Sequence, residues 1–315
     1  VVWHPFTAVR QDTLNIGLKG GEGVYLIAEN GDRYLDAIGS WWVNLHGHAH
    51  PDISKAVANQ AAKLEHAIFA GFTHEGAVEL AERLLKHMPN AHSHIFYSDN
   101  GSTAIEVAIK LAIQYWYNQG EKRKRIIAID GSYHGDTFGA MSVGERGVFT
   151  EPFDPYLFGV DFIDFPEAGM EDKVFDQFCA LCEKGDVAAF VFEPLVQGTA
   201  GMRVYSSDLL DKMMAKCKDM GIISIADEVM TGFGRTGTFL VVDQIKNQPD
   251  LIALSKGLTG GYLAMGATSC AAFLRDAFWE ENAGQYPERR RCLQGHSYTG
   301  NPLACAIGIE AMKVV

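Results

Sequence analysis

Five short apolar runs, separated by longer stretches of helical periodicity, constrain the fold of this 315-residue chain more than any other feature. Runs of this length are typical of strands buried on both faces, and their alternation with helices is typical of a mostly parallel sheet. We therefore predict the α/β class, with a mostly parallel sheet covered by helices. Ligands bind beyond the carboxyl ends of the strands in such sheets. The predicted strands are Ile95 to Tyr97, Arg125 to Ile129, Val187 to Phe192, Ile222 to Ala226 and Leu251 to Ala253.

The segments on either side of this pattern have a different character. Residues 23–27 and 33–37 are extended runs around Glu29-Asn30-Gly31-Asp32, which predicts a hairpin. Apolar residues between Pro51 and His87 recur at helical spacing. Residues 302–315 predict an apolar helix that stops without a glycine cap or a polar tail, so we expect the chain to be cut short there.

Composition excludes several classes of function. With 27 basic and 39 acidic residues the formal net charge is -12, which repels phosphate backbones and argues against nucleic-acid binding. The sequence has no apolar run close to the roughly 20 residues that span a bilayer, and its first residues do not resemble a signal peptide. Six scattered cysteines do not resemble a disulfide framework. We expect a cytoplasmic protein with no membrane contact.

The first strand runs into a segment that favours anion binding. Ile95 to Tyr97 is followed by Ser98-Asp99-Asn100-Gly101-Ser102-Thr103, and a strong helix begins near Ala104. Backbone amides and hydroxyl groups therefore gather at a helix N-terminus, where anions bind. Taken alone, the segment favours an ordinary helix cap over an anion site.

Two charged residues follow later strands. Asp227 comes after the run Ile222 to Ala226, where a buried acid needs a cationic partner. Lys256 comes after Leu251 to Ala253 among small and apolar residues, and desolvation there makes a lysine a usable amine nucleophile. The plain alternatives are a salt-bridged or capping aspartate and a surface lysine.

Three further patterns are weaker. Gly232 to Gly237 spells GxGxxG, but five residues separate it from the strand, and Thr238 to Val242 after it reads as extended rather than as a helix. His46-Gly47-His48 resembles the metal pair of some hydrolases, although no further ligand set accompanies it, so a metal-dependent hydrolase is the rival class and we predict no metal. Cys179 and Cys182 form a CxxC at helical spacing, which favours packing.

Five linked motifs bring these sites together. They are Asn100-Gly101-Ser102, Tyr133-His134-Gly135, Asp227-Glu228, Ser255-Lys256-Gly257 and Gly300-Asn301-Pro302. In this order and at these separations they resemble the class III (ornithine and GABA type) aminotransferases over essentially the whole chain. The resemblance implies a pyridoxal-phosphate-dependent transferase of fold type I. It divides the chain into residues 1–46 of a small domain, residues 47–300 as the large cofactor-binding domain, and residues 301–315 as the start of a C-terminal part.

The resemblance also assigns roles within the cofactor site. Lys256 holds pyridoxal phosphate as a Schiff base and moves protons as acid and base, while Asp227 keeps the pyridine nitrogen protonated. Gly101 and Ser102 bind the phosphate, and Tyr133 stacks on the ring. His296 and Ser297 reach the phosphate of the neighbouring subunit, which implies a homodimer with shared active sites.

The substrate site follows from the same resemblance. Its implied lining residues are Trp41, Tyr133, Lys256 and Gly295, and its implied supporting residues are Phe6, Trp42, Asp136 and Arg235. Within the class, the branch that moves an amino group from S-adenosylmethionine to 8-amino-7-oxononanoate in biotin synthesis is the most similar. The segments that carry this likeness are Trp3 to Thr7, Ser40-Trp41-Trp42, Tyr133 to Thr137 and Gln197 to Tyr205. Another omega-aminotransferase is the alternative, and lysine is an alternative amino donor.

The chain departs from the family pattern at three places. Thr199 stands where ornithine and GABA relatives carry a glutamate that gates an arginine, which argues against those substrates. Phe6 replaces the usual tyrosine, so that position offers only apolar contact. Relatives continue past residue 315 into a part that includes an arginine for the substrate carboxylate.

Overall fold

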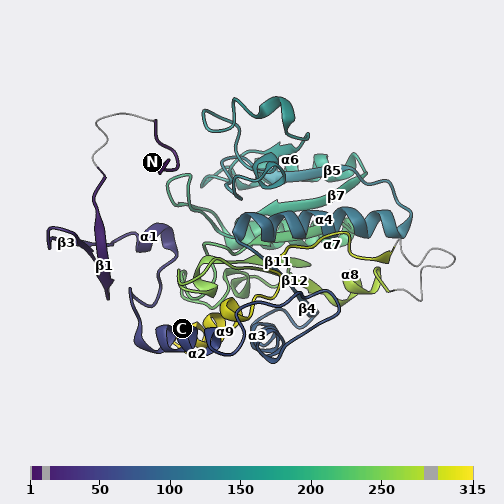
Figure 1. Ribbon diagram of the computed structural model, residues 1–315. Coiled ribbons are helices and arrows are strands. Elements are labelled where there is room, and N and C mark those ends of the chain that lie inside the picture. Colours follow the sequence, from purple (N-terminus) through teal and green to yellow (C-terminus); the bar gives the residue numbers. More distant parts are fainter. Residues whose placement is uncertain (1, 9–14, 280–289, 315) are drawn as a thin grey trace.

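The computed structural model describes residues 2–8, 15–279 and 290–314, and its centre is a seven-stranded sheet (Figure 1). The strand order is β4-β12-β11-β10-β7-β5-β6. The strands from β11 to β6 are parallel to their neighbours, whereas β12 is antiparallel to both β11 and β4. The predicted mostly parallel sheet is confirmed. Its strands are β4 (His92–Ser98), β5 (Arg125–Ile129), β6 (Asp161–Ile163), β7 (Val187–Phe192), β10 (Ile223–Asp227), β11 (Leu251–Leu254) and β12 (Gly266–Ala271).

Helices cover both faces of this sheet, as predicted. One face carries α4 (Gly101–Gln119), α5 (Phe138–Ser142) and α8 (Ala272–Asp276). The other carries α3 (Glu75–Leu85), α6 (Glu171–Glu183), α7 (Ser207–Met220) and α9 (Pro302–Ala311). Strand β5 shows the alternation that this requires, because Ile126 and Ala128 face α4 while Ile127 and Ile129 face the opposite layer. Apolar residues are therefore needed at every position of a central strand.

A second, three-stranded antiparallel sheet lies beside the main body (Figure 1). It consists of β1 (Leu18–Glu22), β2 (Tyr25–Ala28) and β3 (Arg33–Leu35). Strands β2 and β3 form the predicted hairpin, and β1 was not predicted. The chain then passes through α1 (Gly39–Trp42) and α2 (Pro51–Ala61). The short remaining elements are β8 (Val196–Gln197), β9 (Arg203–Val204), η1 (Asp154–Tyr156), η2 (Val241–Gln244) and η3 (Lys256–Leu258).

The structure differs from the sequence prediction in two segments. Strand β12 was missed because Gly-Ala-Thr-Ser-Cys-Ala contains mostly small residues, which are not enriched in strands. The segment Thr238 to Val242 forms no strand: residues 238–240 form bends that lead into η2, in which Val241 and Val242 are buried. The predicted C-terminal helix begins at Pro302 and ends at Ala311, and Val315 lies outside the described residues. Among the described residues, no helix is both long and apolar enough to cross a membrane.

Gly266, at the start of β12, provides a test of how tightly the structure is packed at this end of the strand. A Cβ at this position would overlap the backbone carbonyl oxygen of Asn100 and approach the Ser98 hydroxyl. We therefore predict that Gly266→Ala lowers the free energy of unfolding by about 1–3 kcal/mol, the range for overpacking. Urea denaturation measures this effect. Gly20→Ala is the control, because a Cβ there meets nothing within 4 Å, and equal losses in the two variants would contradict the prediction.

Candidate active site

A cavity of about 400 Å³ lies beyond the carboxyl ends of the parallel strands. This volume is within the range of cofactor and small-molecule sites, about 300–1,000 Å³. Six of the predicted site residues line it: Trp42, Gly101, Ser102, Tyr133, Asp227 and Lys256. Segments far apart in the sequence therefore converge at one edge of the sheet.

The N-terminus of α4 forms one wall of the cavity. Asn100 caps the helix by accepting a hydrogen bond from the Thr103 amide at 3.0 Å, and the Thr103 hydroxyl accepts one from the Asn100 amide at 2.9 Å. The amides of Gly101 and Ser102 donate to no acceptor among the residues that the structure describes. Two free amides, the Ser102 hydroxyl and the helix dipole together form a site for an anion such as a phosphate.

Glycine is required on both sides of this helix terminus. A Cβ on Gly101 would come within 2.7 Å of the Val229 side chain, and one on Gly135 would overlap Ser102. Gly135 also has a φ of +124°, which L side chains rarely adopt. A side chain at Gly101 would push away the segment after β10, and a side chain at Gly135 would push the loop after β5 away from the anion site.

Asp227, the last residue of β10, presents a buried carboxylate to the cavity. Its Oδ2 lies 2.7 Å from His134 Nδ1, and its Oδ1 accepts a hydrogen bond from the Val229 amide at 3.0 Å. The His134 side chain is fully buried, and its Nε2 has no partner in the described part of the chain. The sequence motif contained His134, but no role had been assigned to it. Its ring fixes the orientation of the carboxylate.

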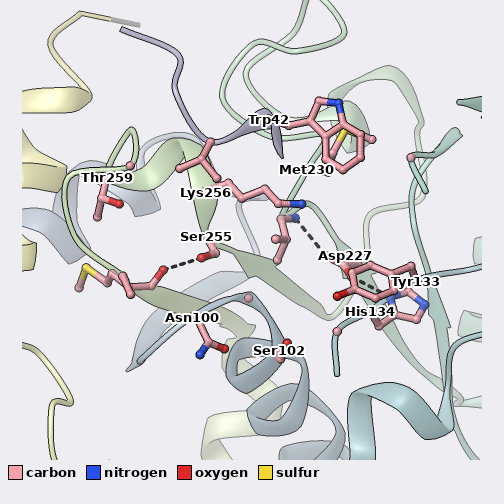
Figure 2. Close-up of a pocket in the computed structure, with 18 of the residues that line it drawn as sticks. Trp42, Asn100, Ser102, Tyr133, His134, Asp227, Met230, Ser255, Lys256 and Thr259 are labelled. Atoms are coloured by element: carbon pink, nitrogen blue, oxygen red, sulfur yellow. Dashed lines mark hydrogen bonds and ion pairs between the residues drawn. The ribbon is translucent and has the colours of Figure 1, made fainter. Parts of the chain in front are cut away.

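Lys256 follows β11 and extends into the cavity between Trp42 and Asp227 (Figure 2). Burial lowers the pKa of its amine, although the carboxylates of Asp227 and Glu193 act in the opposite direction. Its Nζ lies 5.2 Å from the centre of the Trp42 ring. A lysine with a lowered pKa has a larger neutral fraction, which makes it a usable nucleophile and proton acceptor.

Tyr133 lines the cavity from the loop after β5. Its hydroxyl donates a hydrogen bond to Asp136 Oδ2 at 2.9 Å. Burial, and then the charge of Asp136, raise the pKa of this phenol. The hydroxyl therefore stays protonated near neutral pH, and Asp136 acts on the cavity by orienting the tyrosine.

Glu193 is a cavity residue that the sequence analysis missed. It directly follows β7, its side chain is buried, and its two oxygens accept hydrogen bonds from the amides of Tyr133 and Gly198, both at 3.0 Å. Burial raises its pKa to about 7. Its position directly after the apolar run Val187 to Phe192, like that of Asp227 after its own run, was the signal that could have revealed it.

Three other predicted residues, Arg235, Trp41 and Phe6, do not line the cavity. Arg235 lines no part of it, but its Nη2 donates to the Trp42 carbonyl oxygen and its Nε to that of Met230, both at 2.8 Å. Trp41 is 54% exposed, and its ring lies 6.1 Å from that of Phe6, which is also exposed. The tryptophan that lines the cavity is Trp42, so contact of Trp41 with a substrate stays a prediction.

Gly295, His296 and Ser297 also lie outside the cavity. His296 Nδ1 lies 3.0 Å from Asp99 Oδ2, while Gly295 and Ser297 are exposed. The pair with Asp99 places His296 close to the segment that leads into α4. Their role at a phosphate group stays a prediction.

The weaker sequence patterns have structural explanations. His46 Nε2 bonds the Ala311 carbonyl oxygen at 3.0 Å, His48 bonds Asn44 and Asp36, and Cys182 is buried in the core. The GxGxxG segment forms turns after β10 and opens no α-helix. The described residues contain no group of three or more His, Cys, Asp or Glu side chains arranged to hold a metal ion.

The residues of the cavity fit pyridoxal phosphate. The free amides of Gly101 and Ser102 suit its phosphate, the ring of Tyr133 and the side chain of Val229 offer two surfaces for its ring, and Asp227 suits the pyridine nitrogen. Lys256 supplies the amine that its aldehyde carbon requires. Together with a mostly parallel α/β sheet, this arrangement defines a pyridoxal-phosphate-dependent transferase of fold type I.

Comparison with known proteins gives the family. The model of the aminotransferase class-III family matches residues 6–315, and the chain belongs to this family. An adenosylmethionine-8-amino-7-oxononanoate aminotransferase from Synechococcus elongatus is 48% identical over 322 aligned residues, which cover 100% of this chain and 75% of that protein. Pyridoxal phosphate is the cofactor of the family, and so of this site.

Solved structures agree with this family. The crystal structure of adenosylmethionine-8-amino-7-oxononanoate aminotransferase from Methanocaldococcus jannaschii superposes with a TM-score of 0.93 at 36% identity, and the match covers 99% of this chain and 72% of that one. A PLP-bound amine transaminase from an uncultivated Pseudomonas species gives 0.92 at 32% identity, with 99% and 74% covered.

The buried carboxyl group of Glu193 makes a pH-dependent prediction. Its folded-state pKa of about 7 lies above the ordinary value of 4.5, so the folded chain keeps a proton that the unfolded chain has lost. Stability contributed by this group is therefore full below about pH 4.5 and declines as pH rises to about 7. Glutamine does not titrate, so we predict that the free energy of unfolding of Glu193→Gln rises relative to that of wild type as the pH increases from about 4.5 to about 7. The expected change in this difference is on the order of 2 kcal/mol, and it levels off above pH 7.

Urea denaturation at a series of pH values measures this difference. Glu82→Gln is the matched control, because Glu82 is exposed on α3. A stability difference between Glu193→Gln and wild type that does not vary from pH 5 to pH 7 would contradict the assignment.

Proposed function

We propose that this chain transfers the amino group of S-adenosylmethionine to 8-amino-7-oxononanoate, giving 7,8-diaminononanoate in biotin synthesis. The observation that carries aminotransfer is the presence of Lys256 and Asp227 at neighbouring strand ends in one cavity. The substrates are supported by the names of the relatives, above all by the protein that is 48% identical over the full length of this chain.

The residues of this chain have distinct tasks in such a reaction. Pyridoxal phosphate, when bound, carries the amino group between the two substrates and takes up the electron pair that is left when the reacting carbon loses its proton. Lys256 Nζ anchors the cofactor and then moves a proton to and from that carbon. Asp227, oriented by His134, holds the proton of the pyridine nitrogen. Gly101 and Ser102 hold the phosphate.

The side of the cavity nearest Thr199 supports the proposed substrate class. Thr199 lines the cavity together with Gly198 and Met230, and none of these three residues has a charged side chain. A glutamate at this position would be needed to hold an arginine, as the ornithine and GABA types do. Uncharged side chains at this place suit the apolar chain of the proposed acceptor, 8-amino-7-oxononanoate.

A different amine substrate is the second candidate. The observation that favours it is the similarity to an amine transaminase, with a TM-score of 0.92 at 32% identity. The two candidates share the cofactor and Lys256, and they differ only in the molecules that enter the cavity.

We further propose a homodimer with shared active sites. An apolar surface adjoins Gly295 to Ser297: Ile68, Phe72, Leu293 and Tyr298 are each more than 60% exposed. Segments 65–74 and 298–301 pack together, since the His66 and Tyr298 rings lie 5.1 Å apart and Asn301 bonds the Glu65 carbonyl oxygen. Exposed apolar surface of this kind marks protein interfaces. Burial of this surface by a second copy would bring His296 and Ser297 toward the partner's phosphate site.

A cytoplasmic location belongs to the same proposal. All six cysteines are free thiols, which fits a reducing compartment. No nucleic-acid partner is proposed, because the net charge is -12.

The donor is tested by single-turnover experiments on the full protein. We predict that S-adenosylmethionine converts the bound cofactor to its amino form, seen as loss of its visible absorption, and that 8-amino-7-oxononanoate restores the absorption. Lysine and simple amines, tested at equal concentration, serve as comparisons. Conversion by a simple amine but not by S-adenosylmethionine would establish the second candidate.

Two substitutions test the roles of the charged residues. Borohydride reduction followed by peptide mapping is expected to find the cofactor on Lys256 only, and Lys256→Ala is expected to lose turnover while keeping its fold.

Asp227→Asn is expected to keep some cofactor and lose most activity, about a hundredfold or more, because an amide cannot hold the pyridine proton. A label on another lysine, or near-native rates in Asp227→Asn, would refute these roles.

A further inference from the structure

The segment α1 that carries Trp41 and Trp42 has an unusual backbone. Gly39, Ser40, Trp41 and Trp42 have φ angles of +54°, +49°, +62° and +63°, so α1 is one turn of left-handed helix. Only glycine visits this region freely, because Cβ crowds the following carbonyl oxygen in other residues. Three consecutive non-glycine residues keep this conformation only where surrounding contacts enforce it.

Asp36 supplies contacts of this kind. Its Oδ1 accepts a hydrogen bond from the Ser40 amide at 2.9 Å, and its Oδ2 accepts one from the Ser40 hydroxyl at 2.7 Å. Oδ2 also lies 2.9 Å from His48 Nε2. The Asp36 side chain is only 6% exposed. Burial acts to raise the pKa of Asp36, but the hydrogen bonds from Ser40 and His48 lower it overall, so the carboxylate is charged at neutral pH.

His48 is itself fixed on all sides. Its Nδ1 lies 2.8 Å from Asn44 Nδ2, and with Nε2 on Asp36 both ring nitrogens are engaged. Its amide donates to the Gly23 carbonyl oxygen at 2.7 Å and its carbonyl oxygen accepts from the Gly23 amide at 3.1 Å. The Asp36 amide donates to the Val24 carbonyl oxygen at 2.9 Å. The Asp36–His48 pair is thereby attached to the loop between β1 and β2.

The other side of the turn is attached to the cavity. Arg235 joins the Trp42 carbonyl oxygen to that of Met230, which lines the cavity. The Trp42 ring covers Lys256 Nζ at 5.2 Å (Figure 2). The turn therefore spans the distance from the N-terminal sheet to the amine of Lys256.

We propose that Asp36 and His48 are positioning residues, which hold the left-handed turn so that the Trp42 ring covers Lys256 and shields it from water. They touch neither cofactor nor substrate and act through Trp42. The His46-Gly47-His48 motif thus contains a functional histidine that binds no metal. This inference rests on the proposed aminotransferase site, in which Lys256 carries the cofactor.

A double-mutant cycle tests the proposal on the full protein with bound pyridoxal phosphate. The readout is the rate at which hydroxylamine releases the cofactor from Lys256, followed by absorbance, because this rate reports access to the Lys256 bond without turnover. We expect Asp36→Ala and Trp42→Ala each to raise the rate about threefold or more, the lower range for coupled neighbours. The double variant is expected to release no faster than Trp42→Ala alone.

Two comparisons separate positioning from a general loss of stability. His92→Asn removes a buried histidine that bonds Ser269 and the Pro249 carbonyl oxygen at the opposite end of β4, so it is expected to lower the melting temperature and leave the release rate unchanged. Asp36→Asn keeps an oxygen for the Ser40 amide and is expected to restore part of the protection. Where Asp36→Ala does not fold, Ser40→Ala replaces it, since it removes only the hydroxyl donor.

The outcomes that overturn the proposal are specific. Asp36 would be structural only if Asp36→Ala changed the release rate by the same factor in the wild-type and Trp42→Ala backgrounds. The same conclusion would follow if Asp36→Ala lowered the melting temperature and left the release rate unchanged. A wild-type chain that carries no cofactor on Lys256 would reject the proposed function instead. In that case acrylamide quenching of tryptophan fluorescence, with Trp42→Phe as the reference, reads the turn directly, and unchanged quenching in Asp36→Ala would overturn the positioning role.

Discussion

The parallel pairing of β10 with β11 is the constraint on which the rest of the site depends. Asp227 pairs with Ala253, and the chain needs only three more residues to reach Lys256. The register thus places a carboxylate and an amine at the same edge of the sheet. Both strands are fully buried, so a shift of register would move charged groups into the core. The apolar sequence of the two strands therefore fixes the chemistry at their ends.

Much of this arrangement could be predicted from sequence, for a physical reason. Arg125 to Ile129 and Val187 to Phe192 were predicted to the residue, because a strand buried on both faces must be apolar throughout and polar residues mark its ends. Asp227 and Lys256 were found in the same way, as the first charged residues after such runs. Strand β12 was not predicted because its residues are small, and its first residue, Gly266, is restricted by a tertiary contact with Asn100 and Ser98.

The parts that could not be predicted depend on contacts between distant residues. Ser40, Trp41 and Trp42 would be expected in ordinary right-handed or extended backbone, since none of them is glycine. Their left-handed turn follows from Asp36 on one side and Arg235, almost 200 residues further along, on the other. His134 has the same character, because its role arises from a hydrogen bond across 93 positions of sequence. Local propensity contains no information about either contact, so neither the turn nor the role of His134 could be predicted from the sequence.

The acid groups of the cavity show why similar residues at similar positions take different tasks. Glu193 and Asp227 both stand where a buried strand reaches the cavity, at the ends of β7 and β10, and both are buried. Glu193 receives hydrogen bonds only from backbone amides, and burial raises its pKa to about 7. Asp227 Oδ2 also lies 2.7 Å from His134 Nδ1, so this carboxyl group has a side-chain partner that Glu193 lacks. Only a carboxylate that stays charged can retain a proton on a pyridine nitrogen, because a neutral acid would have no charge to offer it. The contact with His134 orients Asp227, the residue that we propose for this task, whereas Glu193 holds the loops that carry Tyr133 and Gly198.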